Sequence, residues 1–478
     1  MALQRVRAWR LSACALMLPL TAAWAASDIT QEFDGTPSAF ESTYKPLPSQ
    51  AFALVNAHIL TGTGSEIENG KLVVSEGKVR AIGADIPLPE GIAVYDLKGE
   101  WVTPGIIDVH SHLGVYSAPG ISTSEDGNEM TGPVTAEVWA EHSIWPQDPQ
   151  FRLALEGGVT TMQILPGSAN LIGGRGVTVK NVPARTMQDM KFPGAPYSLK
   201  MACGENPKRV YGEGRKQAPM TRMGNVAGYR ASWIEAQQYI RDWEEYSQKK
   251  SEYEKTKKGD APKPPKRDLR LETLAGVLKG KILVHNHCYR ADEMAVMLDV
   301  AKEFHYKITA FHHAVEAYKI ADKLAENGVC AAMWADWWGF KHEAYDMVRE
   351  NIALVDKQPN SCAILHTDSA IGIQHMNQDA AKAMAAGNKM GLNITRAHAI
   401  QWITSNPAKA LGIADVTGTL EVGKNADIVV WDRDPFSVYA KTQQVYLDGA
   451  KLFDRHDATF QPVSDFDLGI VNPEGERP

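Results

Sequence analysis

Two histidines separated by one residue close the apolar run at residues 105–112, which reads GIIDVHSH. A β-strand places residues i and i+2 on the same face, so His110 and His112 are expected to point in the same direction. Two imidazole nitrogens that converge on one point are suited to binding a metal ion. The alternative is a structural pair that bonds to backbone carbonyls, and other residues must decide between the two.

More side chains that bind metals or move protons stand at the ends of later apolar runs. They are Lys200 in YSLKMACGEN, His285 and His287 in ILVHNHC, His312 and His313 in TAFHHAVEAYK, and Asp368 in CAILHTDS. Taken singly, such a histidine is commonly structural, a lysine extends its ammonium to solvent, and an aspartate caps a helix. Taken together, they supply more nitrogen and oxygen ligands than one zinc ion requires.

The elements that would position these side chains alternate along the middle of the chain. Apolar strand-like runs are separated by helical stretches such as RADEMAVMLDVAKEF. This rhythm predicts parallel βα units. Functional residues gathered at strand ends are typical of a (β/α)8 TIM barrel, whose active site lies at the carboxyl ends of the strands. We therefore expect an α/β fold of this kind.

Two β-rich segments flank this region, at residues 51–104 and 418–454, and could pair with each other in one small domain. A polar stretch at about 229–267 interrupts the barrel pattern and is predicted to be a solvated insertion, with an exposed helix followed by a Pro-Lys loop. The glycine-rich run LIGGRGVTVK, with Gly173, Gly174 and Gly176, lacks the features of a phosphate loop and is expected to be a loop over the barrel mouth.

Three segments together resemble the metal-dependent amidohydrolase superfamily: VTPGIIDVHSHL, TSNPAKALGI and GTLEVGKNADIVVWD. The middle of the chain is similar to the imidazolonepropionase-related branch, which includes secreted dipeptidase-like members. The resemblance extends from Ala51 to Asp454. It implies a TIM barrel with a small β-sandwich domain built from both termini. The expected division is a signal peptide at 1–25, the sandwich at 26–103 and 412–478, and the barrel at 104–411.

The resemblance also implies a divalent metal site. Its expected ligands are His110, His112, Lys200, His287, His313 and Asp368. His285 shares a strand face with His287 and stays open as the alternative ligand, whereas His312 is expected to face away from His313. In this branch the lysine is carboxylated and bridges two metals, so we expect two zinc ions, or manganese, iron, cobalt or nickel, on carboxylated Lys200. A mononuclear site is the alternative.

The implied function is an exported hydrolase that cleaves a carbon–nitrogen amide bond in a dipeptide, an N-acyl amino acid or a cyclic amide. Metal-activated hydroxide would attack, with Asp368 as the general base. Tyr289 and Arg290 follow the ligand His287 and are candidates for binding a substrate carboxylate or an oxyanion. The alternatives are a lactonase or a deaminase on the same metals, or a non-catalytic barrel scaffold.

Composition excludes some other classes of function. The formal net charge of -7, without a basic stripe interleaved with aromatic residues, argues against a nucleic-acid partner. No segment approaches the ~20 apolar residues needed to span a bilayer. The expected partner is a small-molecule substrate, and a homo-oligomer stays open.

The first residues have the pattern of a secretory signal. Basic residues at 5, 7 and 10 precede the apolar run LSACALMLPLTAAWAA, and cleavage is expected after Ala25. A bacterial periplasmic or secreted protein follows from this pattern, with a lipoprotein signal at Cys14 as the alternative. The remaining cysteines are expected to be free buried thiols, with one disulfide left open. They are Cys203, Cys288, Cys330 and Cys362.

Other residues of types found in functional sites can be explained by structural roles. Trp334, Trp337 and Trp338 could line an apolar pocket or pack in the core. His366 and His375 flank Asp368 in the sequence and are interpreted as structural or surface residues.

Overall fold

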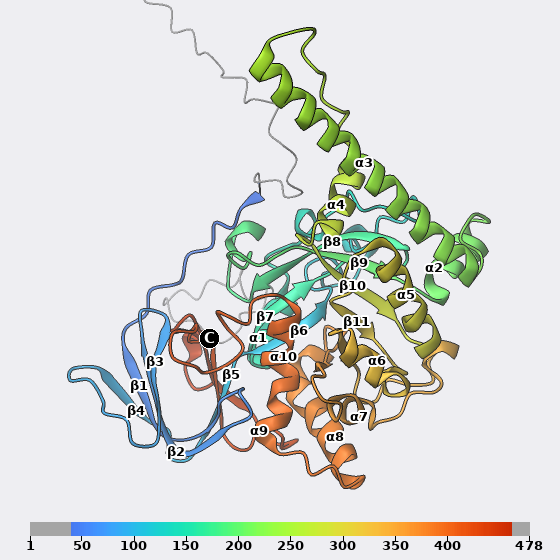
Figure 1. The fold of residues 1–478 in the computed structure, drawn as a ribbon. Coiled ribbons are helices and arrows are strands. Elements are labelled where there is room, and N and C mark those ends of the chain that lie inside the picture. Colours follow the sequence, from blue (N-terminus) through green and yellow to red (C-terminus); the bar gives the residue numbers. More distant parts are fainter. Residues whose placement is uncertain (1–39, 461–478) are drawn as a thin grey trace, which may run out of the picture.

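The computed structural model describes residues 40–460. Figure 1 shows a barrel-like sheet with helices packed around it, and a second sheet beside it that combines both ends of the described chain. The predicted signal peptide and its cleavage site lie outside the described residues.

Eight strands form the barrel sheet, in the order β13-β12-β11-β10-β9-β8-β7-β6. They are β6 (Ile106–Ser111), β7 (Val159–Ile164), β8 (Ile172–Lys180), β9 (Ser198–Ala202), β10 (Leu283–Cys288), β11 (Ala310–His313), β12 (Cys330–Met333) and β13 (Ala363–Leu365). The backbone amide of Asp368, just after β13, donates to the carbonyl of His110 in β6 at 3.2 Å. The sheet is therefore nearly closed.

The barrel departs from the expected all-parallel arrangement at β8. This strand pairs antiparallel with both β7 and β9, whereas the other neighbours in the sheet are parallel. The described segment between β7 and β9 contains no α-helix. A strand that returns directly without a crossover helix must run antiparallel to its predecessor, so one βα unit is replaced by a meander.

The glycine-rich run is part of β8, and the expectation of a loop over the barrel mouth is wrong. Every residue of β8 is buried. Gly174 has a φ of 114°, and a Cβ at this position would overlap the carbonyl oxygen of Val138. The glycine allows another segment to approach the strand closely, which is a recognised use of glycine within a sheet.

Helices cover the outer face of the barrel sheet (Figure 1). They are α1 (Pro149–Glu156), α2 (Glu205–Lys208), α3 (Arg222–Thr256), α4 (Leu269–Leu278), α5 (Ala291–Phe304), α6 (Ala321–Glu326), α7 (Asn351–Asp356), α8 (Met376–Lys389), α9 (Arg396–Ala399) and α10 (Ser405–Ala410). In α5 the buried residues Met294, Met297 and Ala301 recur at helical spacing and share a core cluster with the outward-facing Phe311 of β11. No described helix combines the length and hydropathy needed to cross a membrane.

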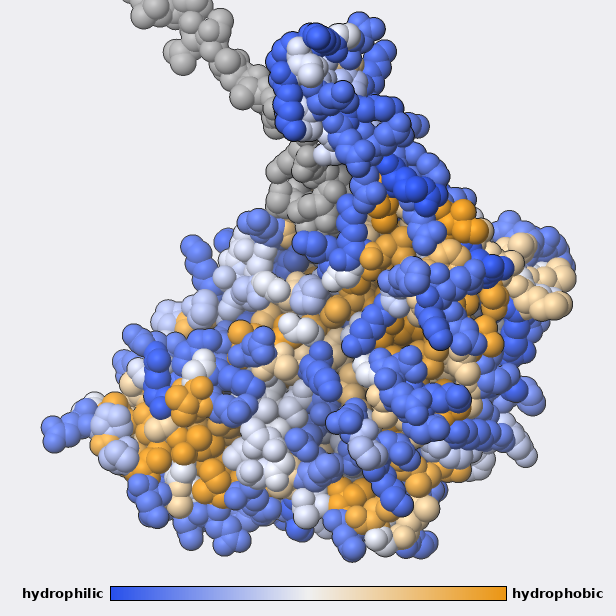
Figure 2. Space-filling view, in the orientation of Figure 1, coloured by the Kyte–Doolittle hydropathy of each residue, from blue (hydrophilic) through white to orange (hydrophobic). Residues whose placement is uncertain are grey.

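The polar insertion is a helix followed by a loop, but the helix begins earlier than predicted and is not the exposed helix that was expected: Tyr239, Trp243 and Tyr246 are buried and form a cluster with Ala275 of α4. Helix α3 starts at Arg222, where the Thr221 side chain accepts from the Gly224 amide at 3.0 Å as an N-cap. Its far end projects from the barrel in Figure 1, and Figure 2 shows that this end is covered with hydrophilic residues. Closer to the barrel, Trp233 and Tyr229 are buried and hold the helix base against the core.

The second sheet takes strands from both ends of the chain, as predicted. They are β1 (Phe52–Leu60), β2 (Glu66–Ser75), β3 (Lys78–Gly83), β4 (Ala93–Asp96), β5 (Trp101–Pro104), β14 (Ile428–Trp431), β15 (Thr442–Leu447) and β16 (Ala450–Asp454). Strand β14 pairs with β5 and so joins the two ends. Alternate residues of β14 face different cores: Ile428 and Val430 face the sheet's own cluster, while Val429 and Trp431 belong to the barrel cluster. The strands form one continuous sheet, and its division into a two-layer sandwich stays a prediction.

All four cysteines of the described chain are paired in two disulfides, Cys203–Cys288 and Cys330–Cys362. The expectation of free buried thiols is therefore wrong. Sequence spacing gave no sign of the pairing because each bond joins neighbouring barrel strands or their flanks, which come together only when the sheet forms. The first bond connects the carboxyl ends of β9 and β10, next to His287.

Candidate metal centre

The six predicted ligands come from five barrel strands or the residues that follow them. His110 and His112 belong to or follow β6, Lys200 lies in β9, His287 in β10, His313 in β11, and Asp368 follows β13. Because parallel strands end at the same rim of a barrel, side chains separated by 258 positions in the sequence (110 to 368) meet at one end of the sheet. The contacts among these side chains divide them into two neighbouring groups.

The first group consists of His110, His112 and Asp368. The Nε2 atoms of the two histidines are 3.3 Å apart, and Asp368 Oδ1 lies 3.6 Å from the first and 3.2 Å from the second. The other ring nitrogen of His112 is 2.8 Å from the carbonyl oxygen of Leu165. That contact holds a proton on Nδ1 and leaves the Nε2 lone pair free for a ligand. Lys200 Nζ lies 3.2 Å from His110 Nε2, beside this group.

The second group consists of His287 and His313, whose ring centroids are 4.5 Å apart. Both rings are buried, and neither nitrogen of His287 nor Nδ1 of His313 has a hydrogen-bond partner. Buried polar atoms are normally satisfied, so three nitrogens without a partner call for a binding partner that is not a protein group. His313 Nε2 is 4.0 Å from Asp368 Oδ2, which connects the two groups. Imidazole nitrogens and a carboxylate form a donor set that fits divalent zinc and similar ions.

The prediction that His312 faces away from His313 is wrong. His312 Nδ1 lies 2.9 Å from His110 Nδ1, and both His312 and His313 have ring centroids 4.8 Å from that of His110. The cause is a left-handed backbone: φ is 67° at His313 and 36° at Ala314. This conformation ends the strand alternation, so two consecutive side chains point into the barrel. Strained φ values of this kind are frequent at functional sites.

His285 and His287 share the inner face of β10, as predicted, but lie in different surroundings. His285 Nδ1 lies 2.8 Å from Nε2 of His312 on the neighbouring strand β11. His287 packs against His313 and Tyr289 at ring-centroid distances of 4.5 and 4.9 Å. His285 therefore belongs to a deeper layer of histidines than His287.

His366, which the sequence indicated to be a structural or surface residue, lies among the candidate metal ligands. Its side chain is buried, and the ligand atoms of His110, His313 and His366 lie within 4.8 Å of one another. The backbone amide of His313 donates to His366 Nε2 at 3.2 Å, while His366 Nδ1 has no partner. The sequence does contain one sign of a functional role for His366. It is separated from Asp368 by one residue, as His110 is from His112.

Burial dominates the electrostatics of the centre. It is the largest cause that lowers the pKa of Lys200 to about 8, and it lowers the pKa of His110, His287 and His313 well below the usual histidine value. The imidazoles are thereby kept neutral, which is the form that binds metals. Burial also raises the pKa of Asp108 to about 7, although the His110 amide and the Thr367 hydroxyl donate to its carboxylate at 3.0 and 2.7 Å.

The two residues predicted to bind substrate have different positions. Tyr289 is buried beside His287 and His313, and Lys341 Nζ lies 3.8 Å above its ring. Arg290 instead forms an ion pair with Asp292, with Nε 2.9 Å from Oδ1, and within residues 40–460 its side chain makes no ion pair or hydrogen bond with a metal ligand. Its proximity to His287 in the sequence does not bring it into the same surroundings.

The tryptophan cluster contributes to the wall of the centre through one member. Trp334 is buried, its ring centroid is 4.3 Å from that of His313, and its indole donates to the Thr367 carbonyl at 3.0 Å. Trp337 stacks on Trp334 but is 41% exposed, and Trp338 is 55% exposed. The cluster therefore runs from the candidate metal site to the surface.

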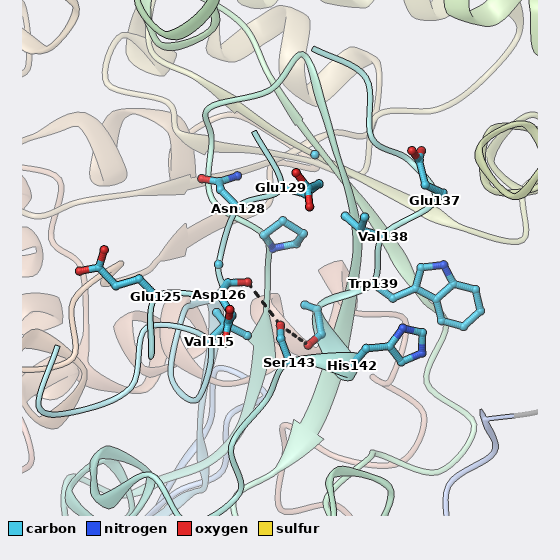
Figure 3. A pocket seen from close by; sticks show the side chains of 14 residues that line it. Val115, Glu125, Asp126, Asn128, Glu129, Glu137, Val138, Trp139, His142 and Ser143 are labelled. Atoms are coloured by element: carbon cyan, nitrogen blue, oxygen red, sulfur yellow. Dashed lines mark hydrogen bonds between the residues drawn. The ribbon is translucent and has the colours of Figure 1, made fainter. Parts of the chain in front are cut away.

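Two cavities open next to the centre. One, of about 290 Å³, is lined by His112, Tyr116, Asn128, Ser168, Asn206 and Arg209, among others. The other, of about 390 Å³, shares Asn128 with the first and is lined by Glu125, Asp126, Glu129, Glu137 and His142, among others. Figure 3 shows the acidic side chains distributed around this second cavity. Only the first cavity includes a candidate metal ligand.

Known proteins are similar to this chain in sequence and in fold. A sequence profile of the amidohydrolase family matches residues 317–453. The protein named amidohydrolase tasK from Hapsidospora irregularis is 32% identical over 401 residues, which are 80% of this chain and 40% of that protein. An imidazolonepropionase from Colwellia psychrerythraea is 33% identical over 141 residues, or 24% of this chain and 33% of that protein. The chain thus spans less than half the length of these two relatives.

A solved structure with similar sequence is matched over its full length. It is an amidohydrolase from Thermotoga maritima, with a TM-score of 0.74 and 35% sequence identity, and the match covers 84% of this chain and 100% of that one. Members of this superfamily are generally metal-dependent, in agreement with the donor set at the barrel rim. The chain belongs to the amidohydrolase family.

Proposed function

We propose that this protein is an exported, metal-dependent hydrolase that breaks a carbon–nitrogen amide bond in a dipeptide, an N-acyl amino acid or a cyclic amide. The observation that carries the proposal is the convergence of Nε2 of His110, Nε2 of His112 and Oδ1 of Asp368 at the barrel rim, where all three lie within 4.8 Å of one another. Family membership supports hydrolysis as the type of reaction.

Two divalent ions would divide the ligands between them. His110, His112 and Asp368 would hold the first, His287 and His313 the second, and Lys200 would join the two. When bound, such ions lower the pKa of water and polarise a carbonyl group, which is the chemistry that amide hydrolysis needs. The unpartnered nitrogens of His287 and His313 support the second position.

Lys200 would act in a carboxylated form. A buried ammonium 3.2 Å from His110 Nε2 would oppose a cation bound there. The ammonium first loses one proton to give the neutral amine. Addition of CO₂ to this amine forms a bond between Nζ and carbon and releases a second proton, so the side chain changes from a cation to an anion with two oxygen ligands. The position of Lys200 between the strands that carry the two histidine groups favours a bridging role.

Asp368 would move the proton. Its carboxylate is 24% exposed and contacts His110 and His112 at 3.6 and 3.2 Å, so it can be reached both from the ligands and from solvent. We assign it the proton released when water adds to the scissile carbonyl. The same proton then passes to the leaving nitrogen as the carbon–nitrogen bond breaks, which returns the carboxylate to its starting form.

Export is proposed from two features. The basic, apolar and Ala-Trp-Ala sequence of residues 5–25 has the order of a secretory signal. The disulfides Cys203–Cys288 and Cys330–Cys362 are compatible with an oxidising compartment such as the bacterial periplasm.

The test is a screen of metal-loaded protein against dipeptides, N-acyl amino acids, cyclic amides, lactones and aminated purines. Amide cleavage releases a new amine or opens a ring, deamination releases ammonia, and lactone hydrolysis releases only acid. We expect turnover of amides that is lost in Asp368→Asn. Turnover restricted to lactones, or ammonia release restricted to purines, would replace the proposed reaction by one of its alternatives.

A further inference from the structure

Arg209 shares a cavity with a candidate metal ligand. The cavity of about 290 Å³ at the barrel rim is lined by both His112 and Arg209. Arg209 stands at the start of a wide helical turn, Arg209–Gly214, that directly follows α2. Turns of this π type are frequent at functional sites. The segment that follows β9, the strand of Lys200, therefore places Arg209 in the wall of a cavity that also includes His112.

The charge of Arg209 has no partner within the part of the chain that the structure describes. Arginines nearby are paired: Arg222 with Glu293 and Glu343, and Arg290 with Asp292. For Arg209, by contrast, no ion pair or side-chain hydrogen bond with residues 40–460 is present. A guanidinium at a cavity surface with all its donors available is suited to bidentate binding of a carboxylate.

Neighbouring polar groups complete the cavity wall. Asn206 Nδ2 donates to Ser168 Oγ at 2.9 Å, and its Oδ1 accepts from Lys341 Nζ at 3.3 Å. Lys341 is itself balanced by Glu343, whose carboxylate lies 3.4 Å away. Lys341 thus orients Asn206 rather than offering a free charge to the cavity.

The base of this segment is anchored to the loop after β12. Glu343 Oε1 accepts the backbone amide of Glu205 at 2.6 Å. The contact requires Gly204, because a Cβ there would overlap the Glu343 carboxylate and φ at this glycine is 81°. Arg209 therefore extends from a backbone that is held in place, which limits the ordering cost of binding.

The second cavity has an acidic lining. It adjoins the first through Asn128 and is lined by Glu125, Asp126, Glu129 and Glu137 (Figure 3). An anionic group would be repelled from it. Among the described residues, Arg209 is the only lysine or arginine that lines either cavity.

We infer that Arg209 forms an anion subsite that binds a free carboxylate of the substrate, with Asn206 and Ser168 as neutral hydrogen-bonding neighbours. This inference rests on the proposed amide hydrolysis and narrows it to N-acyl amino acids and dipeptides, which carry such a carboxylate next to the scissile amide. Arg290, the candidate from the sequence, is replaced in this role.

The test uses the full, metal-loaded protein and paired probes: N-acetyl amino acids and the same compounds with the carboxylate capped as a carboxamide. Binding is measured by ligand-observed NMR, and turnover by release of the amino acid or its amide. We expect the free acids to be favoured by ~10- to 100-fold, the usual effect of a charged hydrogen-bonded contact. In Arg209→Met this preference should disappear, mainly through KM, whereas Arg209→Lys should retain part of it.

Arg290→Met is the control, because it also removes one arginine, a half-buried one that pairs with Asp292, and should leave the preference unchanged. Equal binding of acids and carboxamides to the unaltered protein, or an unchanged preference in Arg209→Met, would overturn the subsite. Amide turnover without a carboxylate preference would overturn the subsite and leave the proposed function intact. If no amide is cleaved, the proposed function fails, and the NMR preference still decides whether Arg209 binds carboxylates.

Discussion

The Nδ1 atoms of His110 and His312 lie 2.9 Å apart inside the barrel, and His312 Nε2 lies 2.8 Å from His285 Nδ1. If Nε2 of His110 binds a metal, the donor and the acceptor of both hydrogen bonds are determined. The proton of His110 then resides on Nδ1 and is donated to His312, which carries its own proton on Nε2 and donates it to His285. The deeper histidines thereby set the tautomer of the proposed ligand, a role typical of groups behind a metal site.

Replacement of His312 by Phe should weaken metal binding. The ring volume is largely kept, but Nδ1–H of His110 loses its acceptor, and the loss of such a partner typically costs 10- to 100-fold, so we expect about that reduction in affinity. His312→Asn should restore part of the affinity, because an amide oxygen can accept the same proton. The measurement is competition with a metallochromic chelator. Exposed His342 offers the control, and an affinity in His312→Phe equal to that in His342→Phe would contradict the positioning role.

Asp368→Asn should remove both a ligand and the proton carrier. We expect kcat on a cleaved amide to fall by about 10²- to 10⁴-fold, the usual contribution of a general base. The histidine ligands should still bind metal, so mass spectrometry should detect retained ions in the inactive variant. A kcat within a few-fold of the unaltered enzyme would show that another group takes the proton.

The two disulfides should stabilise the fold to different extents. Cys203–Cys288 spans 85 positions and Cys330–Cys362 spans 32, so loop-closure entropy predicts losses of about 4–5 and about 3–4 kcal/mol in the free energy of unfolding when each pair is replaced by alanine. Denaturant unfolding of the two double variants measures the difference. The idea fails if the Cys203→Ala/Cys288→Ala protein is as stable as the oxidised parent.

A histidine outside the metal centre predicts a pH dependence of stability. Nε2 of His398 lies 2.6 Å from the Asp356 carboxylate, and this hydrogen bond raises the pKa of His398 against the smaller effect of burial. A raised pKa in the folded state stabilises the protein fully below the unfolded histidine value of ~6.5, and this stabilisation is lost as pH rises through the folded value. His398→Ala should therefore lower Tm more at about pH 5.5 than at about pH 8.5.

Exposed His342, which has no ion pair within residues 40–460, provides the comparison for that experiment. Its replacement by alanine should change Tm by a similar small amount at both pH values. An equal loss of Tm at acid and alkaline pH in His398→Ala would mean that the Asp356 contact does not depend on protonation.

The sequence predicted the features that depend on local periodicity. The alternation of apolar runs and helices predicted a barrel of strands. The pairing of both chain ends was predicted from the β-rich sequence pattern that they have in common. Period two correctly placed His285 and His287 on one face of β10. The rule failed at His312 because it assumes extended backbone, and the positive φ of His313 could not be recognised from a non-glycine residue.

Other features depend on contacts between distant segments. The antiparallel direction of β8 follows from the absence of a crossover helix before it in the described chain, the glycines at 174 and 176 from the close approach of Val138 and Leu165, and the disulfides from neighbouring strands. Arg290 was chosen for its closeness to His287 in the sequence, but Asp292 neutralises it. Arg209 is not close to any predicted ligand in the sequence. Only its position in the same cavity as His112 distinguishes it from other arginines.

The metal content of the purified protein tests the central claim most directly. Inductively coupled plasma mass spectrometry should find about two divalent ions per chain in the unaltered protein and about one or fewer in Lys200→Ala. Lys200→Glu, which supplies a carboxylate without CO₂, should recover part of the second ion. Fewer than about 0.2 ions per chain after reconstitution with zinc or manganese would contradict a metal-dependent centre. Unchanged stoichiometry in Lys200→Ala would contradict the bridge.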